Sequence, residues 1–349
     1  MMRTLVIRKA FQQYHKTAMI IALWSLMDFG MVKTSIRSAS ASVSLGDHHH
    51  QTSKALVYML IAMLLLPALD AFAKLLSDYQ SSGQIVFYRF LLQSLFLFPI
   101  VFYQGELIRT LTISPFIQFM RGTLMVLATT FFFAALKYMP LAESISIFFV
   151  EPMILTILSA IILGETIRIR RILAIIVGFI GALIVIKPSF AIFGWPAIFP
   201  LCAAFCFALY VVFTRQISGR LSPLPMQFGV GIMALLVATI MLYFGYQFEI
   251  DAVMPKIPQQ AELWLIFGLG FFATIGHIFL TSAVRYADTS LLAPFQYLEI
   301  ISAILLGYLI FSDIPDRQTI FGLVIIISSG IYLMHRERLA RLASKAEQA

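Results

Sequence analysis

The chain has 349 residues, of which 60% are hydrophobic and 12% are charged. A soluble domain needs about 25% charged residues, so this composition excludes an ordinary soluble protein and indicates that lipid is the solvent. The formal net charge of +8 does not indicate a nucleic-acid-binding protein, because outside the apolar segments lysines and arginines cluster only in the terminal tails. A basic excess of this kind is typical of membrane proteins with basic cytoplasmic loops.

Residues 1–53 differ from the rest of the chain in being basic and serine-rich. Their one apolar run, at 17–29, is too short to cross ~30 Å of hydrocarbon at ~1.5 Å per residue. We expect this segment to be a flexible cytoplasmic extension. A signal peptide is the alternative that the same pattern allows.

From residue 55 to residue 334 the chain divides into ten apolar runs, each close to the length that crosses a bilayer. The runs lie at 55–75, 85–103, 115–136, 142–163, 171–187, 194–214, 224–244, 262–282, 288–311 and 318–334. The sequence therefore predicts an all-α polytopic membrane protein with ten transmembrane helices.

The distribution of lysine and arginine predicts the orientation of these helices. With both termini in the cytoplasm, the basic residues of the inner loops outnumber those of the outer loops. The inner set is Arg109, Arg168, Arg170, Arg171, Arg215, Arg220 and Arg285, and the outer set is Lys137, Lys187, Lys256 and Arg317. We therefore expect a multi-pass protein of the inner (plasma) membrane with both termini cytoplasmic.

The segment 135–188 occurs twice, displaced by 148 positions. Ala135-Leu136-Lys137-Tyr138 returns as Ala283-Val284-Arg285-Tyr286, and Glu151 returns as Glu299. The repeats are expected at 54–188 and 189–336, with five helices each, and a cytoplasmic tail follows at 337–349. Because five is odd, the second repeat must enter the membrane from the opposite face. Inverted repeats of this kind build a midplane site between two gates.

Asp70 and Lys74 are charged residues within the first apolar run. Each such charge costs about 2.5–3.5 kcal/mol at the centre of an inserted helix, so each is expected to face a partner or water. They are four residues apart and share a helical face, so they either neutralise each other or contact a polar solute. Pro67 lies one turn earlier and would free a backbone carbonyl beside them.

Glu151 and Glu299 are the acids that the repeat places at equivalent positions, and Gln296 shares a helical face with Glu299. Desolvation at that depth favours the protonated carboxyl, which is the property needed to couple proton movement to solute movement. The alternative is a static ion pair, for example of Glu151 with Arg89 or Arg121. Both arginines lie near the ends of their runs, so their side chains are expected to snorkel to an interface.

Three other residues with reactive side chains are expected to have structural roles. Cys202 and Cys206 lie one turn apart in an apolar run, where a disulfide is geometrically poor and a metal site would be incomplete. His277 is expected to be a hydrogen-bonded core residue, with proton transfer as the alternative. Gly178 and Gly181 predict a close-packing face for a neighbouring helix.

Several of these motifs resemble the EamA domain of the drug/metabolite transporter superfamily. They are Ala135-Leu136-Lys137-Tyr138, Glu151-Pro152, Leu163-Gly164-Glu165, the run from Gly178 to Ile184, and Arg89 within Tyr88-Arg89-Phe90. The resemblance covers residues 55–335. In the second repeat Ile300 takes the place of a proline and Asp313 that of a glutamate, so the gate built there is expected to move differently.

The resemblance implies a ten-helix inner-membrane carrier that moves a small organic metabolite by alternating access, with proton coupling as an option. Members of the family carry amino acids, nucleosides, vitamins, S-adenosylmethionine or drugs, in either direction. Uptake of S-adenosylmethionine or riboflavin is a narrower alternative. The candidate substrate- or proton-binding residues are Glu151, Glu299, Asp70, Lys74, Gln296 and Arg89.

The expected partners are a small-molecule substrate, the lipid bilayer and protons, with no nucleic acid, cofactor or metal; a homodimer is left open. The sequence has no Walker lysine motif, which excludes ATP hydrolysis by this chain. A membrane-embedded enzyme is the alternative of another class, but no His-Glu-x-x-His, Gly-x-Ser-x-Gly or paired intramembrane aspartate occurs. A channel would need a polar filter loop within the membrane, and none stands out.

Overall fold

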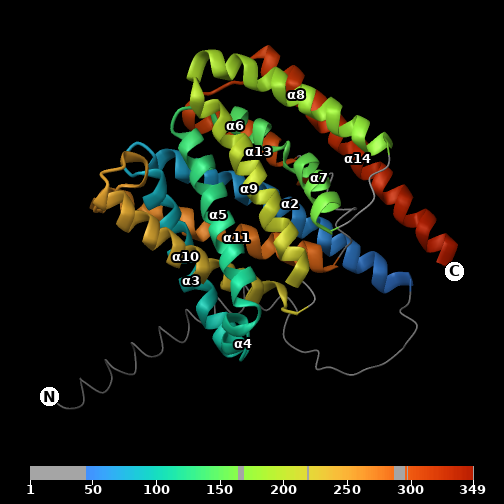
Figure 1. Ribbon diagram of the computed structural model, residues 1–349, viewed down its shortest axis with the longest axis horizontal. Coiled ribbons are helices and arrows are strands. Elements are labelled where there is room, and N and C mark those ends of the chain that lie inside the picture. The colour runs from blue at the N-terminus through green and yellow to red at the C-terminus, as the bar shows by residue number, and fades with distance from the viewer. Residues whose placement is uncertain (1–44, 164–168, 218–219, 287–294, 297, 349) are drawn as a thin grey trace. The chain divides into compact units, whose positions relative to one another are not determined.

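A computed structural model describes residues 45–163, 169–217, 220–286, 295–296 and 298–348. Residues His49–Ala349 form one compact unit. The described elements are all helices (Figure 1), which confirms the predicted all-α class. Residues 1–44 of the predicted N-terminal extension lie outside the described residues, whereas residues 45–53, expected to be flexible, are helical and belong to α2 (Leu45–Leu76). The location of the extension stays a prediction.

Within the described residues, seven helical segments are long and apolar enough to cross a membrane, by length and composition. They belong to α2 (Leu45–Leu76), α3 (Ser82–Tyr103), α5 (Pro115–Leu136), the pair α6 (Leu141–Phe148) and α7 (Glu151–Leu163), α9 (Phe199–Ile217), α10 (Pro223–Gln247) and α11 (Leu263–Tyr286). Shorter apolar segments lie in α8 (Ile169–Phe193), α13 (Leu298–Phe311) and α14 (Arg317–Gln348). Each predicted run therefore overlaps an apolar helix, while the count of ten crossings stays a prediction.

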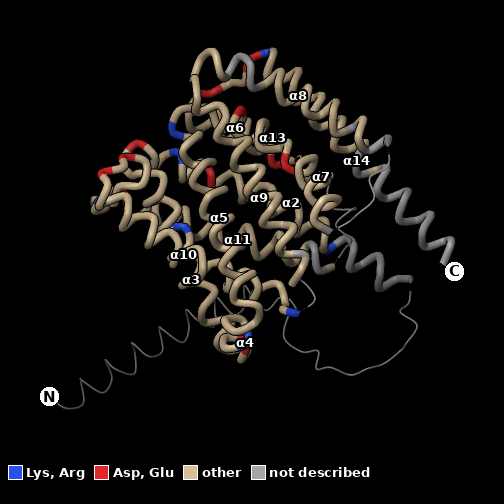
Figure 2. The backbone as a smooth tube through the Cα atoms, viewed as in Figure 1, with Lys and Arg blue, Asp and Glu red and all other residues tan. Residues whose placement is uncertain are grey.

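Short helices connect some of the long ones. They are α4 (Leu107–Thr112), η1 (Trp195–Ile198), η2 (Asp251–Val253) and η3 (Gln260–Glu262). The side chain of Ser81 caps α3 by accepting a hydrogen bond from the backbone N–H of Gln84 at 3.2 Å, as serine does at many helix N-termini. Figure 2 shows that charged positions are sparse along the helices and gather at their ends and connections. This is the distribution expected when the helix middles lie in hydrocarbon.

The fourth predicted run is broken in its middle. Helix α6 ends at Phe148, a turn occupies Phe149 and Val150, and α7 begins at Glu151. Pro152 lacks a backbone N–H, so it fits the first turn of a helix, where that group has no partner within the helix. The predicted run at 142–163 is still one candidate span, Leu141–Ile162, but two helices build it. The break places Glu151 at a helix N-terminus, where the helix dipole favours a negative charge.

The second repeat places its acid in a similar position. Helix α13 begins at Leu298, so Glu299 lies in its first turn. The structure does not describe most of the segment just before it. Both repeats thus place an acidic side chain at the N-terminus of a helix inside an apolar run, a feature that carrier proteins use to build polar sites at membrane depth.

Helices α8 and α14, one from the end of each repeat, lie side by side (Figure 1). A Cβ atom on Gly181 would come within 3.0 Å of the Gly322 carbonyl oxygen, and one on Gly322 would come within 2.8 Å of the Gly181 carbonyl oxygen. Only glycine permits so close an approach of two helix backbones. A Cβ on Gly178 would overlap Met153 of α7. The prediction of a close-packing glycine face is confirmed.

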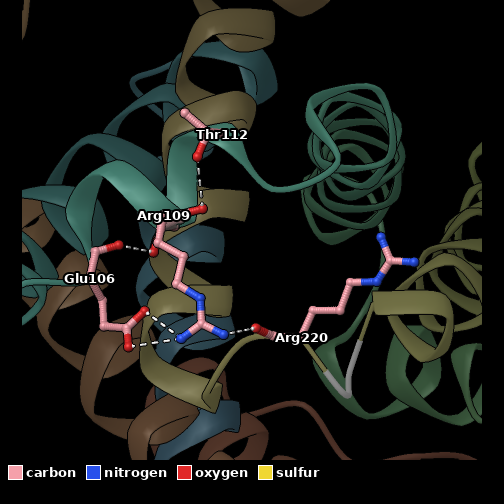
Figure 3. Close-up of polar contacts among 5 residues, drawn as sticks. Glu106, Arg109, Thr112 and Arg220 are labelled. Carbon is pink, nitrogen blue, oxygen red and sulfur yellow. Dashed lines mark hydrogen bonds and ion pairs between the residues drawn. The ribbon is translucent and has the colours of Figure 1, made fainter.

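The two repeats also meet at a loop contact outside the helix bundle (Figure 3). Arg109 of α4 is paired with Glu106 at 3.2 Å and donates a hydrogen bond to the backbone carbonyl of Arg220 at 2.9 Å. Arg220 in turn donates to the Ser114 hydroxyl at 3.0 Å. These contacts join the connection before α5 to the connection before α10, so loops of both repeats hold each other at this point.

Aromatic rings connect α2 of the first repeat to α11 of the second. The Phe72 ring stacks on that of Phe272, with centroids 5.3 Å apart, and meets the edge of Trp264 at 5.8 Å. Large apolar side chains such as Leu183 and Phe321 are more than half exposed on the outer helices. A soluble protein would bury such a surface, whereas a lipid-facing helix exposes it.

Candidate substrate cavity

A cavity of about 160 Å³ lies among helices of both repeats. Five of the six candidate residues from the sequence line it: Asp70, Arg89, Glu151, Gln296 and Glu299. Two further polar side chains, Thr129 and His277, and several aromatic rings complete the lining. The helices therefore bring most of the charges predicted at membrane depth to one cavity.

The lining repeats the internal symmetry of the sequence. Four pairs of lining residues are related by the same displacement of 148 positions: Thr129 and His277, Phe132 and Leu280, Phe148 and Gln296, and Glu151 and Glu299. Equivalent surfaces of the two repeats thus face each other across the cavity. The position of the cavity agrees with the site that inverted repeats are expected to enclose.

Arg89, on α3, is buried at the cavity, with 5% of its surface exposed. Its Nη1 donates a hydrogen bond to the Thr129 hydroxyl oxygen at 2.7 Å, and that hydroxyl donates to the Met125 carbonyl oxygen at 2.7 Å. The Nε atom has no hydrogen-bond partner among the described residues. The expectation that this side chain snorkels to an interface was therefore wrong, because helix α5 supplies a polar partner inside the bundle.

Arg121, on α5, is completely buried. Its Nη1 donates to the Gln118 side-chain oxygen at 2.6 Å, and its Nε donates to the Thr214 hydroxyl at 2.9 Å. The guanidinium carbon lies 5.4 Å from the centre of the Tyr210 ring. The side chain of Arg121 does not snorkel to an interface either, because uncharged side chains of α5 and α9 accept its hydrogen bonds.

Lys74 does not line the cavity. Its ammonium group forms an ion pair with Asp313 at 2.6 Å and lies 4.5 Å from the centre of the Phe311 ring. Lys74 thus pairs across the repeats with a residue 239 positions away, and not with its neighbour Asp70. The reason is geometric: one turn nearer the helix end, the long lysine side chain reaches the connection after α13 while Asp70 stays at the cavity.

The remaining polar lining residues are Thr129 and His277, whose sequence signals were weak. The Nδ1 atom of His277 lies 2.7 Å from the Ala273 carbonyl oxygen of its own helix, which agrees with the expected hydrogen-bonded histidine. Its imidazole also reaches the cavity. The sequence interpretation did not select Thr129. Its displacement of 148 positions from His277 is the signal that would have identified it.

Comparison with known proteins agrees with this arrangement. The EamA-like transporter family matches the chain twice, at residues 53–187 and 194–335. The chain therefore belongs to the EamA-like transporter family, within the drug/metabolite transporter superfamily, and is built from two repeats. It is a multi-pass membrane protein that transports a small metabolite.

Relatives within the family have different named substrates. The chain is 30% identical to an S-adenosylmethionine uptake transporter of Rickettsia felis, over 81% of this chain and 93% of the relative. It is 25% identical to the pseudopaline exporter CntI of Pseudomonas aeruginosa, over 80% of this chain and 95% of the relative. A solved protein structure with 18% identity covers 81% of this chain and 98% of its own, with a TM-score of 0.59; that likeness concerns the fold alone.

Proposed function

We propose that this EamA-like transporter is a secondary carrier for a metabolite that bears a positive charge, with S-adenosylmethionine as the first candidate. The observation that supports this most directly is the charge of the cavity. Three carboxyl groups, those of Asp70, Glu151 and Glu299, face it together with one guanidinium group, that of Arg89. Ionised carboxylates at membrane depth are costly unless a cation compensates them, and a cationic solute is such a compensating group.

The remaining lining suits the other parts of S-adenosylmethionine. Phe132, Phe148, Phe149 and Phe207 present aromatic rings to the cavity. Aromatic rings stack on planar bases such as adenine and attract cations such as the sulfonium and ammonium groups. The similarity to an S-adenosylmethionine uptake transporter supports the same substrate. Riboflavin is the alternative within the family, but it offers no positive charge to the carboxyl groups.

We infer alternating access as the mechanism. The cavity volume of about 160 Å³ is smaller than the roughly 300–1,000 Å³ of most ligand pockets, so binding of a nucleoside-sized solute requires the helices around it to move apart. The break between α6 and α7 supplies a place where the backbone changes direction without bending a continuous helix. Symmetric rearrangement of two repeats would open the cavity to one face or the other.

Proton coupling, topology and the absence of catalysis belong to the same proposal. We propose ten crossings with repeats at 54–188 and 189–336, both termini in the cytoplasm, and an inner-membrane location, on the support of the basic loops. Glu151 and Glu299 are the proposed proton carriers, because each lies at a helix N-terminus and lines the cavity. Transport without chemical conversion of the solute is the proposed activity.

Uptake by proteoliposomes tests the proposed function. Purified wild-type protein should accumulate radiolabelled S-adenosylmethionine faster than protein-free liposomes. Unlabelled S-adenosylmethionine should inhibit this uptake more strongly than riboflavin or S-adenosylhomocysteine, which lacks the sulfonium charge. Asp251→Asn, at an exposed position of the connection before α11, is the matched control and should leave uptake unchanged. Equal inhibition by S-adenosylhomocysteine would show that the cavity does not select the sulfonium charge.

A further inference from the structure

The guanidinium of Arg89 stands out among the buried charges of the molecule. Almost all of its surface is buried. Asp70, which also lines the cavity, interacts with it electrostatically, but Arg89 forms no direct ion pair with the described residues. One of its amino groups is bound to Thr129, while its Nε–H lacks a partner. A buried cation with an unused donor is costly unless an acceptor completes it. The cavity that it lines is the place from which such an acceptor can come.

We propose that Arg89 binds the carboxylate of the transported solute, and that Thr129 positions the guanidinium for this contact. This inference rests on the proposed function and narrows the substrate class to solutes with both a positive charge and a carboxylate. Arginine binds carboxylates through charge-assisted hydrogen bonds. Phosphate groups are disfavoured here, because a doubly charged anion would also face the three carboxyl groups of the cavity.

The two repeats differ at this point, which fixes the orientation of the solute. Thr129 and His277 occupy equivalent positions, but Thr129 accepts a hydrogen bond from Arg89 whereas His277 contacts its own backbone at Ala273. The described cavity lining contains one arginine, and it comes from the first repeat. The carboxylate is therefore held on the side of α3 and α5, and the cationic groups are left to the acids Glu151 and Glu299.

A pair of substrates that differ only in the carboxylate tests this inference. Proteoliposomes with the full chain are given radiolabelled S-adenosylmethionine, and unlabelled S-adenosylmethionine or its decarboxylated analogue is added as competitor. The wild type should bind the decarboxylated analogue about tenfold or more weakly, since a charge-assisted hydrogen bond is lost. In Arg89→Gln the apparent KM for S-adenosylmethionine should rise to the level of the analogue, while the affinity for the analogue stays nearly unchanged.

The outcomes separate this inference from the proposed function. If the wild type does not take up radiolabelled S-adenosylmethionine, the proposed function fails. If the wild type takes up S-adenosylmethionine but both compounds compete equally, or if Arg89→Gln still discriminates between them, the carboxylate contact is overturned while transport stands. If Arg89 has only a structural role, Arg89→Gln should weaken the binding of both compounds by the same factor. That result would also overturn the contact.

Variants of Thr129 keep the test decisive if Arg89→Gln does not fold. Thr129→Val preserves the shape of the side chain but removes the hydroxyl that accepts the Arg89 hydrogen bond, whereas Thr129→Ser retains the hydroxyl. Thr129→Val should lose most of the discrimination between the two compounds. Its KM for S-adenosylmethionine should rise, while its kcat should change little. Thr129→Ser should keep it. Equal discrimination by the two variants would contradict the positioning role.

Discussion

Asp70 and Lys74 lie one turn apart on α2, yet they belong to different parts of the molecule. Asp70 faces the cavity together with acids from both repeats, whereas Lys74 is bound to Asp313 on the far side of the repeat boundary. The first environment holds three carboxyl groups and one guanidinium, an excess of acidic groups that a cationic solute would reduce. The second pairs opposite charges, which compensate each other without a ligand. The comparison teaches that a charge inside an apolar run can either line a cavity or join two helices, and that a shift of one helical turn separates the two cases.

Neutralising the cavity acids should have the largest effect on transport. In Glu151→Gln and Glu299→Gln, uptake of S-adenosylmethionine should fall at least about tenfold, because truncating one partner of a buried charge contact costs about 2–5 kcal/mol. An imposed pH gradient should no longer change the residual flux of the variants. Proteoliposome uptake with and without the gradient checks this expectation. Unchanged gradient-driven flux would remove these residues from the coupling step.

Breaking the Lys74–Asp313 pair should affect stability and leave substrate selection intact. The two side chains are 16% and 29% exposed, so the loss in Lys74→Met should be about 1–2 kcal/mol, between the values for surface and buried pairs. A lowered melting temperature in detergent measures it. The wild-type ratio of S-adenosylmethionine to S-adenosylhomocysteine affinities should persist.

Exchanging the two charges provides the control for that result. Lys74→Asp combined with Asp313→Lys should recover part of the stability lost in either single variant, as expected for residues that interact directly. No recovery in the double variant would indicate that Lys74 acts through Phe311 or another neighbour and not through Asp313.

The exposed Glu106–Arg109 pair should contribute least to the stability of the folded protein. Surface ion pairs are worth about 0–1 kcal/mol, and the Arg109 side chain is 57% exposed. Glu106→Gln should therefore shift the melting temperature less than Lys74→Met does, and uptake should not change. A larger shift than that of Lys74→Met would mean that the loop contact of Figure 3 holds the repeats together more firmly than the helix-end pair.

Local patterns in the sequence were sufficient to predict the apolar helices, the duplication and the glycine face of α8. Each depends on residues close together in the chain or on a fixed displacement between two segments. The acids Glu151 and Glu299 were found in the same way, since the repeat places them at equivalent positions. Their presence in one cavity agrees with that interpretation, although their role in transport remains a proposal.

Features that depend on contacts between helices could not be predicted from a single sequence. The partner of Lys74 lies 239 positions away, and no local pattern identifies it. Arg89 and Arg121 were expected to reach an interface because they lie near the ends of their runs. Their burial depends on hydroxyl groups that α5 and α9 bring to them. The turn at Phe149 and Val150 was missed because the hydropathy of the run continues through it.

The central claim is that the acids of the cavity, and not the charges at the helix ends, bind a cationic solute. Equilibrium binding of radiolabelled S-adenosylmethionine to purified protein tests it directly, in wild type, in the double variant Glu151→Gln with Glu299→Gln, and in Lys74→Met. The account predicts saturable binding that the double variant loses and that Lys74→Met retains. Saturable binding of wild-type affinity in the double variant would contradict it.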